Sequence, residues 1–216
     1  MNSPDLETIA AFKAFGPNWK CRGHQFEVGK TYTHDGDVTA CESGYHSCEN
    51  PLDVLNYYDL TTSKFAEVEA SGKISRHEGD SKFASASIKI KAELTLSAFI
   101  GAAVKWVIGN ASKDSKAGDR VKAASGHYAQ LAASGHSAQL AASGDSAQLA
   151  ASGDSAVIAS SAFQSQAKGA NGTWIALAEF DGNYKCIGFA VGCIGKDGLL
   201  PDTYYCARNG KLEVVK

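Results

Sequence analysis

Residues 125–160 read SGHYAQLAA, SGHSAQLAA, SGDSAQLAA and SGDSAVIAS, which are four consecutive nine-residue repeats. A fixed short period is typical of solenoid proteins, in which each repeat packs on its neighbours. Within a repeat the apolar side chains occupy every second position, as at Ala129, Leu131 and Ala133. This alternation predicts a short strand with one inward face, and the Ser-Gly-His/Asp segment predicts a tight turn. The repeats therefore predict a parallel β-solenoid.

The charged turn residues indicate how many repeats make one coil. With two repeats per coil, His127 stacks on Asp145 and His136 stacks on Asp154, so that each imidazole faces a carboxylate. With one repeat per coil, a single column would place like charges next to each other. We therefore favour a flattened coil of eighteen residues. We interpret the four turn residues as polar surface groups; a pH-sensitive band of imidazole–carboxylate pairs is the alternative.

The repeats also supply the candidate binding residues of the chain. Small alanines flank three glutamines, so we expect the outer faces of the coils to be flat and nearly neutral. These faces and turns form the candidate binding surface, which comprises His127, His136, Asp145, Asp154, Gln130, Gln139 and Gln148.

The sequence before the repeats predicts an α+β domain over residues 1–94. Asn50 is a good N-cap and Pro51 suits the first helical position, so a short helix is expected over residues 51–58. Two long strands are expected at residues 64–75 and 83–94, with a polar loop between them.

The sequence around and after the repeats completes a mainly β fold. Residues 95–109 carry an apolar stripe and predict a helix, which we expect to cover the open first coil of the solenoid. The solenoid is assigned to residues 110–170. Residues 171–216 contain Asp-Gly and Asn-Gly turn signals and predict a small antiparallel β cap.

Composition narrows the class of protein. The chain has 216 residues, a net charge of −2 and 44% hydrophobic residues, which argues against a polyanionic partner such as a nucleic acid. It has no apolar run long enough to cross a membrane, and its first residues lack the order of a signal peptide, so we expect a cytoplasmic protein. No phosphate-binding glycine loop or nucleophile elbow is present, so no cofactor is expected.

A cluster of thiols and imidazoles lies in the N-terminal domain. Cys21, His24, Cys41 and Cys48, with His46 nearby, supply enough ligands for a tetrahedral zinc site. The spacings lack the paired short knuckles of zinc ribbons and fingers. We therefore favour buried free thiols and packed histidines, with the metal site as the alternative.

A second pattern of residues is compatible with an enzyme. Arg22-Gly23, the segment 44–47 and the strand that carries Glu67 and Glu69 can be read as an ADP-ribosyltransferase-like arrangement, with arginine or histidine for the dinucleotide and glutamate for the ribose. Arg-Gly pairs are frequent by chance, and glutamates on such a strand usually face solvent. We therefore favour a protein without enzymatic activity and keep this reading as an alternative.

Three segments carry a resemblance to a known family: KAFGPNWKCRGHQFEVGKTY (13–32), CESGYHSCENPLDVLNYY (41–58) and KFAEVEASGKI (64–74). Residues 12–94 resemble an uncharacterised domain family that is common in bacteriophage and prophage proteins. In that family the domain is often followed by Ser/Gly/Ala repeats and by a cap resembling GTWIALAEFDGNYKCIG (172–188) with PDTYYCARNGKLEVV (201–215). The resemblance implies a phage-associated protein and implies no activity.

Together these observations lead us to expect a phage-encoded, non-enzymatic protein-binding protein that acts in the host cytoplasm as an inhibitor of a host defence system. A structural or adhesion protein of the virion or tail is the first alternative, and an ADP-ribosyltransferase-like enzyme is the second. The expected partner is a protein of the host or the phage. A homo-oligomer is also possible, because repeat ends and small-residue faces favour self-association.

Overall fold

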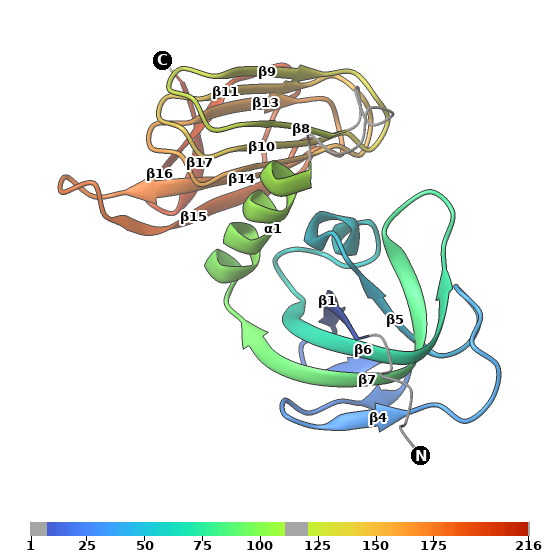
Figure 1. Cartoon of the computed structure of the whole chain (residues 1–216). Helices are drawn as coiled ribbons and strands as arrows, with labels where there is room; N and C mark the ends of the chain where they lie inside the picture. Colours follow the sequence, from blue (N-terminus) through green and yellow to red (C-terminus); the bar gives the residue numbers. More distant parts are fainter. Residues whose placement is uncertain (1–7, 111–120, 216) are drawn as a thin grey trace. The chain divides into compact units, whose positions relative to one another are not determined.

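The computed structural model describes residues 8–110 and 121–215 and is mainly β (Figure 1). The chain divides into two compact units, Met1–Phe99 and Ile100–Lys216. The predicted fold class is confirmed, with an N-terminal domain and a β-solenoid of about three turns.

From residue 8 onward, the first unit forms seven strands and a short 3₁₀ helix, which are β1 (Ile9–Phe15), β2 (Lys20–Cys21), β3 (His24–Gln25), β4 (Thr31–Thr33), β5 (Tyr45–Cys48), η1 (Pro51–Asn56), β6 (Lys64–Arg76) and β7 (Lys82–Leu94). The main sheet has the order β4-β7-β5-β1-β6, and β6 also pairs with β7. This last pairing closes the sheet on itself. Bulges between Glu67 and Val68 and between Ser71 and Ile74 supply the bend that closure requires.

The interior of this closed sheet is apolar and aromatic. Phe15, Phe83, Ile88 and Ile90 are fully buried there, and Phe26 is 3% exposed. Beside this core, the polar side chains of Lys13 and His46 lie where β1, β5 and the β2–β3 hairpin meet. That region holds the site described below.

The expected helix at residues 51–58 is present as the tighter and shorter η1. Asn50 is its N-cap, and the side-chain oxygen of Asn50 accepts a 3.0 Å hydrogen bond from the Leu52 N–H. The N–H groups of Tyr57 and Tyr58 both donate to the Val54 carbonyl and end the turn. Tyr57 and Tyr58 therefore come directly after the buried 3₁₀ helix η1.

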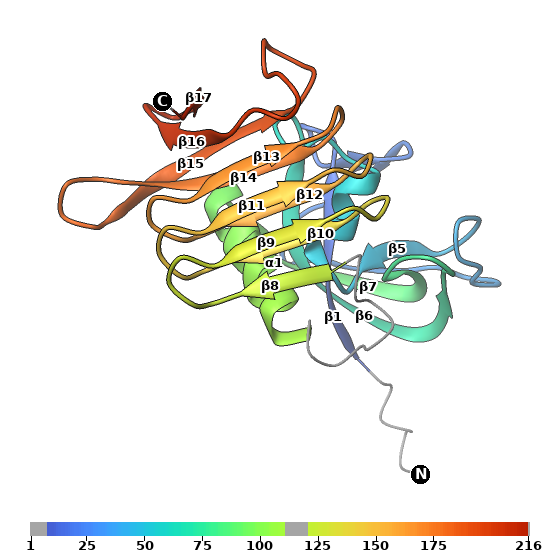
Figure 2. The same ribbon diagram turned by 90° about the horizontal axis from the view of Figure 1, so that it is seen from above.

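The second unit contains the solenoid strands β8 (Val121–Ala124), β9 (Gln130–Ala133), β10 (Gln139–Ala142), β11 (Gln148–Ala151), β12 (Val157–Ser160), β13 (Gln166–Gly169) and β14 (Trp174–Phe180). Even-numbered strands form one sheet and odd-numbered strands form the other (Figure 2). Gln139 pairs with Val157 and Gln130 pairs with Gln148, so equivalent positions lie eighteen residues apart. The predicted eighteen-residue coil is confirmed.

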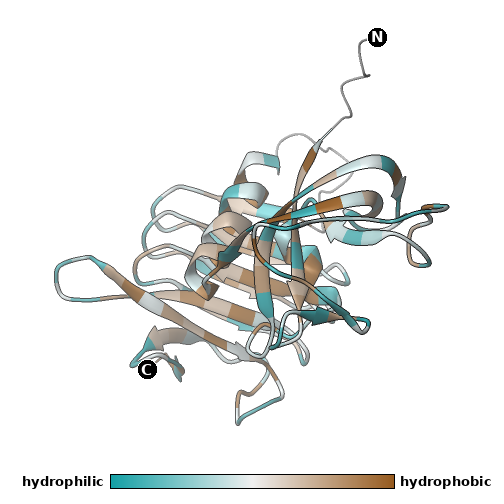
Figure 3. Cartoon of the chain, turned by 90° about the horizontal axis from the view of Figure 1, so that it is seen from below, coloured by the Kyte–Doolittle hydropathy of each residue, from teal (hydrophilic) through white to brown (hydrophobic). Residues whose placement is uncertain are grey.

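The nine-residue pattern follows from the packing of these coils. Leu140, Leu149 and Ile158 are fully buried between the two sheets, whereas the turns are polar, as Figure 3 shows. The fourth residue of each turn adopts a left-handed conformation, with φ of 54° at Ser137 and 57° at Ser146. A Cβ atom on Gly144 would collide with the main chain of Gly126 in the neighbouring coil. Glycine is therefore needed at position 144, where the turn of one coil contacts the turn of the coil before it.

The helix α1 (Leu96–Asn110) is present, but its position differs from the expected one. Its first turn is capped by Thr95, whose hydroxyl accepts a 3.2 Å hydrogen bond from the Ala98 N–H. From Ile100 onward, α1 runs across the outer face of the sheet β8-β10-β12-β14 rather than over the open end of the first coil (Figures 1 and 2).

Because α1 covers this face of the sheet, one glutamine of the repeats is buried instead of exposed. Gln139 was expected to face solvent, yet it is 3% exposed, and its neighbour Ala141 is fully buried. On the opposite sheet Gln130 and Gln148 are exposed as predicted. Small alanines such as Ala141 and Ala159 allow a helix to approach the sheet closely.

Two hairpins follow the last coil. β14 pairs in parallel with β12 and antiparallel with β15 (Cys186–Cys193), through the predicted Asp181-Gly182 turn. β16 (Tyr205–Arg208) pairs with β17 (Lys211–Val214) through Asn209-Gly210, and Tyr205 lies opposite Ala167 of β13. Neither α1 nor any other helix of the described residues has the length and apolarity that crossing a membrane requires.

Candidate functional site

A cavity of about 590 Å³ opens in the first unit, next to β1, β5 and the β2–β3 hairpin. This volume lies in the range of small-molecule sites, roughly 300–1,000 Å³. Three cations contribute to the cavity wall, namely Lys13, Arg22 and Lys82. Glu42 is the single carboxylate among the lining residues, so the wall carries a positive excess.

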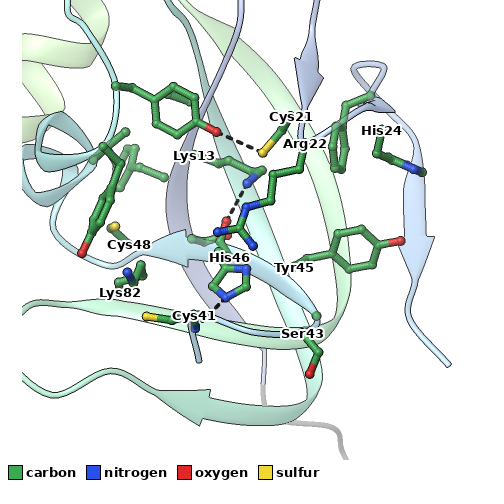
Figure 4. Close-up of a pocket in the computed structure, with 18 of the residues that line it drawn as sticks. Lys13, Cys21, Arg22, His24, Cys41, Ser43, Tyr45, His46, Cys48 and Lys82 are labelled. Carbon is green, nitrogen blue, oxygen red and sulfur yellow. Dashed lines mark hydrogen bonds between the residues drawn. The ribbon is translucent and has the colours of Figure 1, made fainter. Parts of the chain in front are cut away.

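Lys13 comes from the middle of β1 and is 5% exposed. Its Nζ atom donates a 2.8 Å hydrogen bond to the His46 carbonyl oxygen and lies 5.5 Å from the centre of the Phe15 ring (Figure 4). Burial lowers the pKa of the Lys13 ammonium, and the thiols of Cys21 and Cys48 partly offset this effect. Burial thus disfavours the charged form of this amine, and Lys13 contributes less positive charge to the wall than an exposed cation would.

Arg22 stands at the tip of the β2–β3 hairpin, where it adopts φ of 48° and Gly23 adopts φ of 81°. Its exposed side chain extends toward His46 (Figure 4). Arg76 and Arg208 pair with Glu49 and Glu213, whereas Arg22 has no carboxylate partner within the described ranges. The guanidinium is thus free to receive a ligand in the fork geometry that suits phosphates and carboxylates.

His46, on β5, lies beside Arg22 in the cavity wall (Figure 4). Its Nε2 atom accepts a 2.9 Å hydrogen bond from the Cys41 N–H, and the other ring nitrogen bonds to the main chain of Gly44. Burial, with smaller effects from the cations Lys13, Arg22 and Lys82, lowers the pKa of His46 to about 4. The imidazole is therefore neutral at physiological pH.

Lys82 lies at the other end of the cavity, on β7. Its Nζ atom lies 4.0 Å from the centre of the Tyr57 ring. The Tyr57 hydroxyl donates to Oδ2 of Asp80, and Oδ1 of Asp80 accepts a hydrogen bond from the main-chain N–H of Lys82. Asp80 is outside the cavity lining, and the ammonium of Lys82 lies over the Tyr57 ring.

Two weakly acidic groups sit deeper in the wall. Burial raises the pKa of the Cys48 thiol, and the carboxylates of Asp53 and Asp80 raise it further. Burial also raises the pKa of the Tyr58 hydroxyl, which lies 3.0 Å from the Cys21 sulfur atom. Both groups are therefore protonated at neutral pH and add no negative charge to the cavity.

The opposite part of the wall is aromatic. Phe26, Tyr45 and His24 line it, with centroid distances of 6.0 Å from Tyr45 to Phe26 and 6.2 Å from Tyr45 to His24. Ser47 is buried in the neighbouring strand position, and its hydroxyl has no hydrogen-bond partner among the residues that the structure describes. A bound ligand or water can satisfy that group.

The structure places all four candidate metal ligands in the wall of this cavity. Cys21, His24, Cys41 and Cys48 all line it. Yet across residues 8–110 and 121–215, no three side chains of His, Cys, Asp or Glu converge as metal ligands. The irregular spacings thus correspond to separate wall positions.

Only some residues of the ADP-ribosyltransferase-like arrangement lie in the cavity. Arg22, Tyr45, His46 and Ser47 line the cavity, but the two glutamates do not. Glu69 pairs instead with Lys91 at 3.1 Å. Glu67 is exposed on β6.

The repeat candidates lie in the second unit. His127 Nδ1 is 3.4 Å from an Asp145 carboxylate oxygen, as the eighteen-residue spacing predicted, with side chains 74% and 52% exposed. Their role in binding stays a prediction, as does that of His136 and Asp154.

Sequence reasoning missed Lys13, Tyr57, Tyr58 and Lys82 as site residues. One signal was available for Lys13, because it is a charged residue inside the otherwise apolar strand IAAFKAF. The paired tyrosines gave no signal beyond core packing. Lys82 resembled any other polar residue at the start of a strand.

The chain was compared with known proteins. No curated protein and no solved structure gives a significant match. Residues 9–102 match a family described as "Domain of unknown function (DUF7666)". This range includes every residue that lines the cavity. The N-terminal part of the chain is thus similar to this family.

Proposed function

We propose that the N-terminal domain binds a small anionic ligand in the cavity beside β1 and β5. The observation that carries this proposal is the excess of basic side chains in the wall, Lys13, Arg22 and Lys82, over the single carboxylate of Glu42. Arg22 and Lys82 supply most of its positive charge, because burial lowers the pKa of Lys13. The histidine and the deeper thiol and phenol are uncharged at neutral pH, so they leave that excess in place. Arg22 supplies the strongest recognition element because it faces the cavity without an acidic partner.

Isothermal titration calorimetry of the full chain with inorganic pyrophosphate tests this function. We expect binding that weakens as NaCl is raised, and a large loss in Arg22→Gln. Lys20→Gln is the matched control, because Lys20 is an exposed cation on the same hairpin that lies outside the cavity lining. Equal affinity in both variants would contradict the proposal.

A second function is supported by a different observation, on the second unit. Tyr128 and Tyr184 are 78% and 73% exposed, and Ile187 is 59% exposed. The Tyr184 ring lies 4.9 Å from Phe163, which is a turn residue eighteen positions after Asp145. Exposed aromatic side chains on a rigid scaffold are typical of protein-binding surfaces. We therefore also propose that this unit binds a protein partner.

The resemblance of residues 12–94 to phage and prophage proteins directs this second proposal toward a host protein in the cytoplasm, for example a defence protein. A place in the virion is the alternative. Affinity capture from infected and uninfected lysates, with mass spectrometry, tests both. Tyr128→Ser is a well-matched variant, since serine occupies the same left-handed position at Ser137, Ser146 and Ser155. A host protein that the wild type captures in stoichiometric amounts and the variant loses supports the proposal; equal capture contradicts it.

A further inference from the structure

We infer that the anionic ligand carries a planar ring next to its charged group, so that the cavity takes a nucleotide. This inference rests on the proposed anion-binding function and names the class of ligand. The juxtaposition of cations and aromatic rings in one cavity supports it, together with the size of that cavity.

Aromatic side chains flank the cations on both sides. Figure 4 shows His24 and Tyr45 on one side of Arg22 and His46, with Lys82 on the other. At that second side the Tyr57 ring packs against the Lys82 ammonium, and Tyr57 is 46% exposed. A phosphate held by Arg22 therefore has an aromatic surface within reach in either direction.

The arrangement matches what a nucleotide requires. The phosphate group needs charged donors in a fork or cluster, which arginine and lysine supply. The base needs an aromatic face, and stacking of this kind accepts any base because every base has a π-face. Tyr45 is held in place by its neighbours Phe26 and His24 and by a 3.2 Å hydrogen bond from its hydroxyl to the Thr33 carbonyl oxygen. It is thus a fixed stacking surface.

The cavity volume argues against an inorganic anion as the natural ligand. At about 590 Å³ the space suits an organic molecule with a ring system. A bare phosphate would contact the cations and leave the surfaces of Tyr45 and Tyr57 uncovered. A sugar phosphate would fill more of the space without using the rings.

Calorimetric titration of the full chain separates these ligands. The probes are AMP, GMP, CMP and UMP, with ribose 5-phosphate as the ligand that lacks the ring and adenosine as the ligand that lacks the charge. We expect at least one nucleotide to bind about tenfold or more tightly than ribose 5-phosphate. Adenosine should bind far more weakly than that nucleotide.

Substitutions of Tyr45 and Arg22 test which side chain contacts the base and which contacts the phosphate. Tyr45→Leu should remove the advantage of the nucleotide over ribose 5-phosphate, and Tyr45→Phe, which keeps the ring, should retain it. Arg22→Gln should weaken both phosphates, with Lys20→Gln as the unaffected control. If ribose 5-phosphate binds as tightly as every nucleotide, the nucleotide inference is wrong while anion binding stands. If no phosphate binds, both fail.

Discussion

The Nζ atom of Lys13 on β1 donates a 2.8 Å hydrogen bond to the carbonyl oxygen of His46 on β5, across 33 positions of sequence. The contact ties the buried cation to the strand that also carries Tyr45 and Cys48. It exists because β1 and β5 pair in a sheet that closes on itself. Strand pairing therefore positions Lys13 in the wall of the site, whereas Arg22 reaches the site from the tip of the β2–β3 hairpin.

Replacing the buried ammonium tests whether Lys13 serves binding or stability. Lys13→Met keeps the length of the side chain and removes a poorly solvated charge, so we expect the free energy of unfolding to change by less than about 1 kcal/mol. Pyrophosphate affinity should fall. Urea unfolding and calorimetry measure the two quantities, with Lys20→Met as the surface control. A large loss of stability without loss of binding would make Lys13 a structural residue.

Protonation of His46 should destabilise the protein in acid. Its pKa is lowered to about 4 in the folded state from 6.5, so the unfolded state binds more protons between these values. The contribution of His46 to stability is therefore complete above pH 6.5 and declines as the pH falls toward 4. His46→Gln, whose amide oxygen can accept from the Cys41 N–H, should show a smaller decline in urea midpoint between pH 7 and pH 5. Identical slopes would contradict this assignment.

The cavity thiols should differ in reactivity. Cys41 is exposed, whereas Cys48 is 4% exposed and has a raised pKa. Because the thiolate is the reactive form, iodoacetamide at pH 8 should alkylate Cys41 at least about tenfold faster than Cys48. Peptide mass spectrometry over a time course measures both rates. Exposed Cys186 in the second unit provides the reference rate.

The stacking of the solenoid turns predicts a sharp difference between two glycines at the same repeat position. A Cβ on Gly144 would meet the main chain of Gly126, whereas a Cβ on Gly126 meets no atom within 4 Å. Gly144→Ala should therefore lower the free energy of unfolding by about 1–3 kcal/mol. Gly126→Ala should leave it nearly unchanged. Equal effects in chemical denaturation would show that the coils stack differently.

The turn histidines should contribute little. The His127–Asp145 pair is mostly exposed, and exposed ion pairs stabilise proteins by at most about 1 kcal/mol. Replacing His127 and His136 together by serine should leave the melting temperature nearly unchanged at pH 5.5 and pH 7.5. A large difference between these pH values, absent from the variant, would favour a pH-sensitive band instead.

The solenoid was predictable because its information is local. Each repeat contains the residues that predict its own strand and its own turn. The favourable stacking of His127 on Asp145, eighteen residues later, was enough to choose the coil length. The position of α1 was not predictable. An apolar stripe indicates that a helix packs on another element but does not identify that element. In the structure, the burial of Gln139 shows that α1 covers the outer face of the sheet β8-β10-β12-β14.

The candidate site was predictable only in fragments. The sequence identified Arg22, His46 and the cysteines as chemically capable residues, but it favoured buried free thiols and packed histidines for the cysteine cluster. A metal site, and a set that includes Glu67 and Glu69, were only the alternatives. Their real neighbours, Lys13 and Lys82, reach the cavity through strand pairing across tens of residues. Long-range pairing of this kind leaves no periodic signal in a single sequence.

An NMR titration of the ¹⁵N-labelled full chain with inorganic pyrophosphate is the most direct test of the account. The account predicts amide shifts concentrated around Arg22, Cys41 and His46, saturating with a single dissociation constant and absent from the same titration of Arg22→Gln. Shifts distributed over surface lysines of both units, or no shifts at all, would contradict an anion-binding function for this cavity.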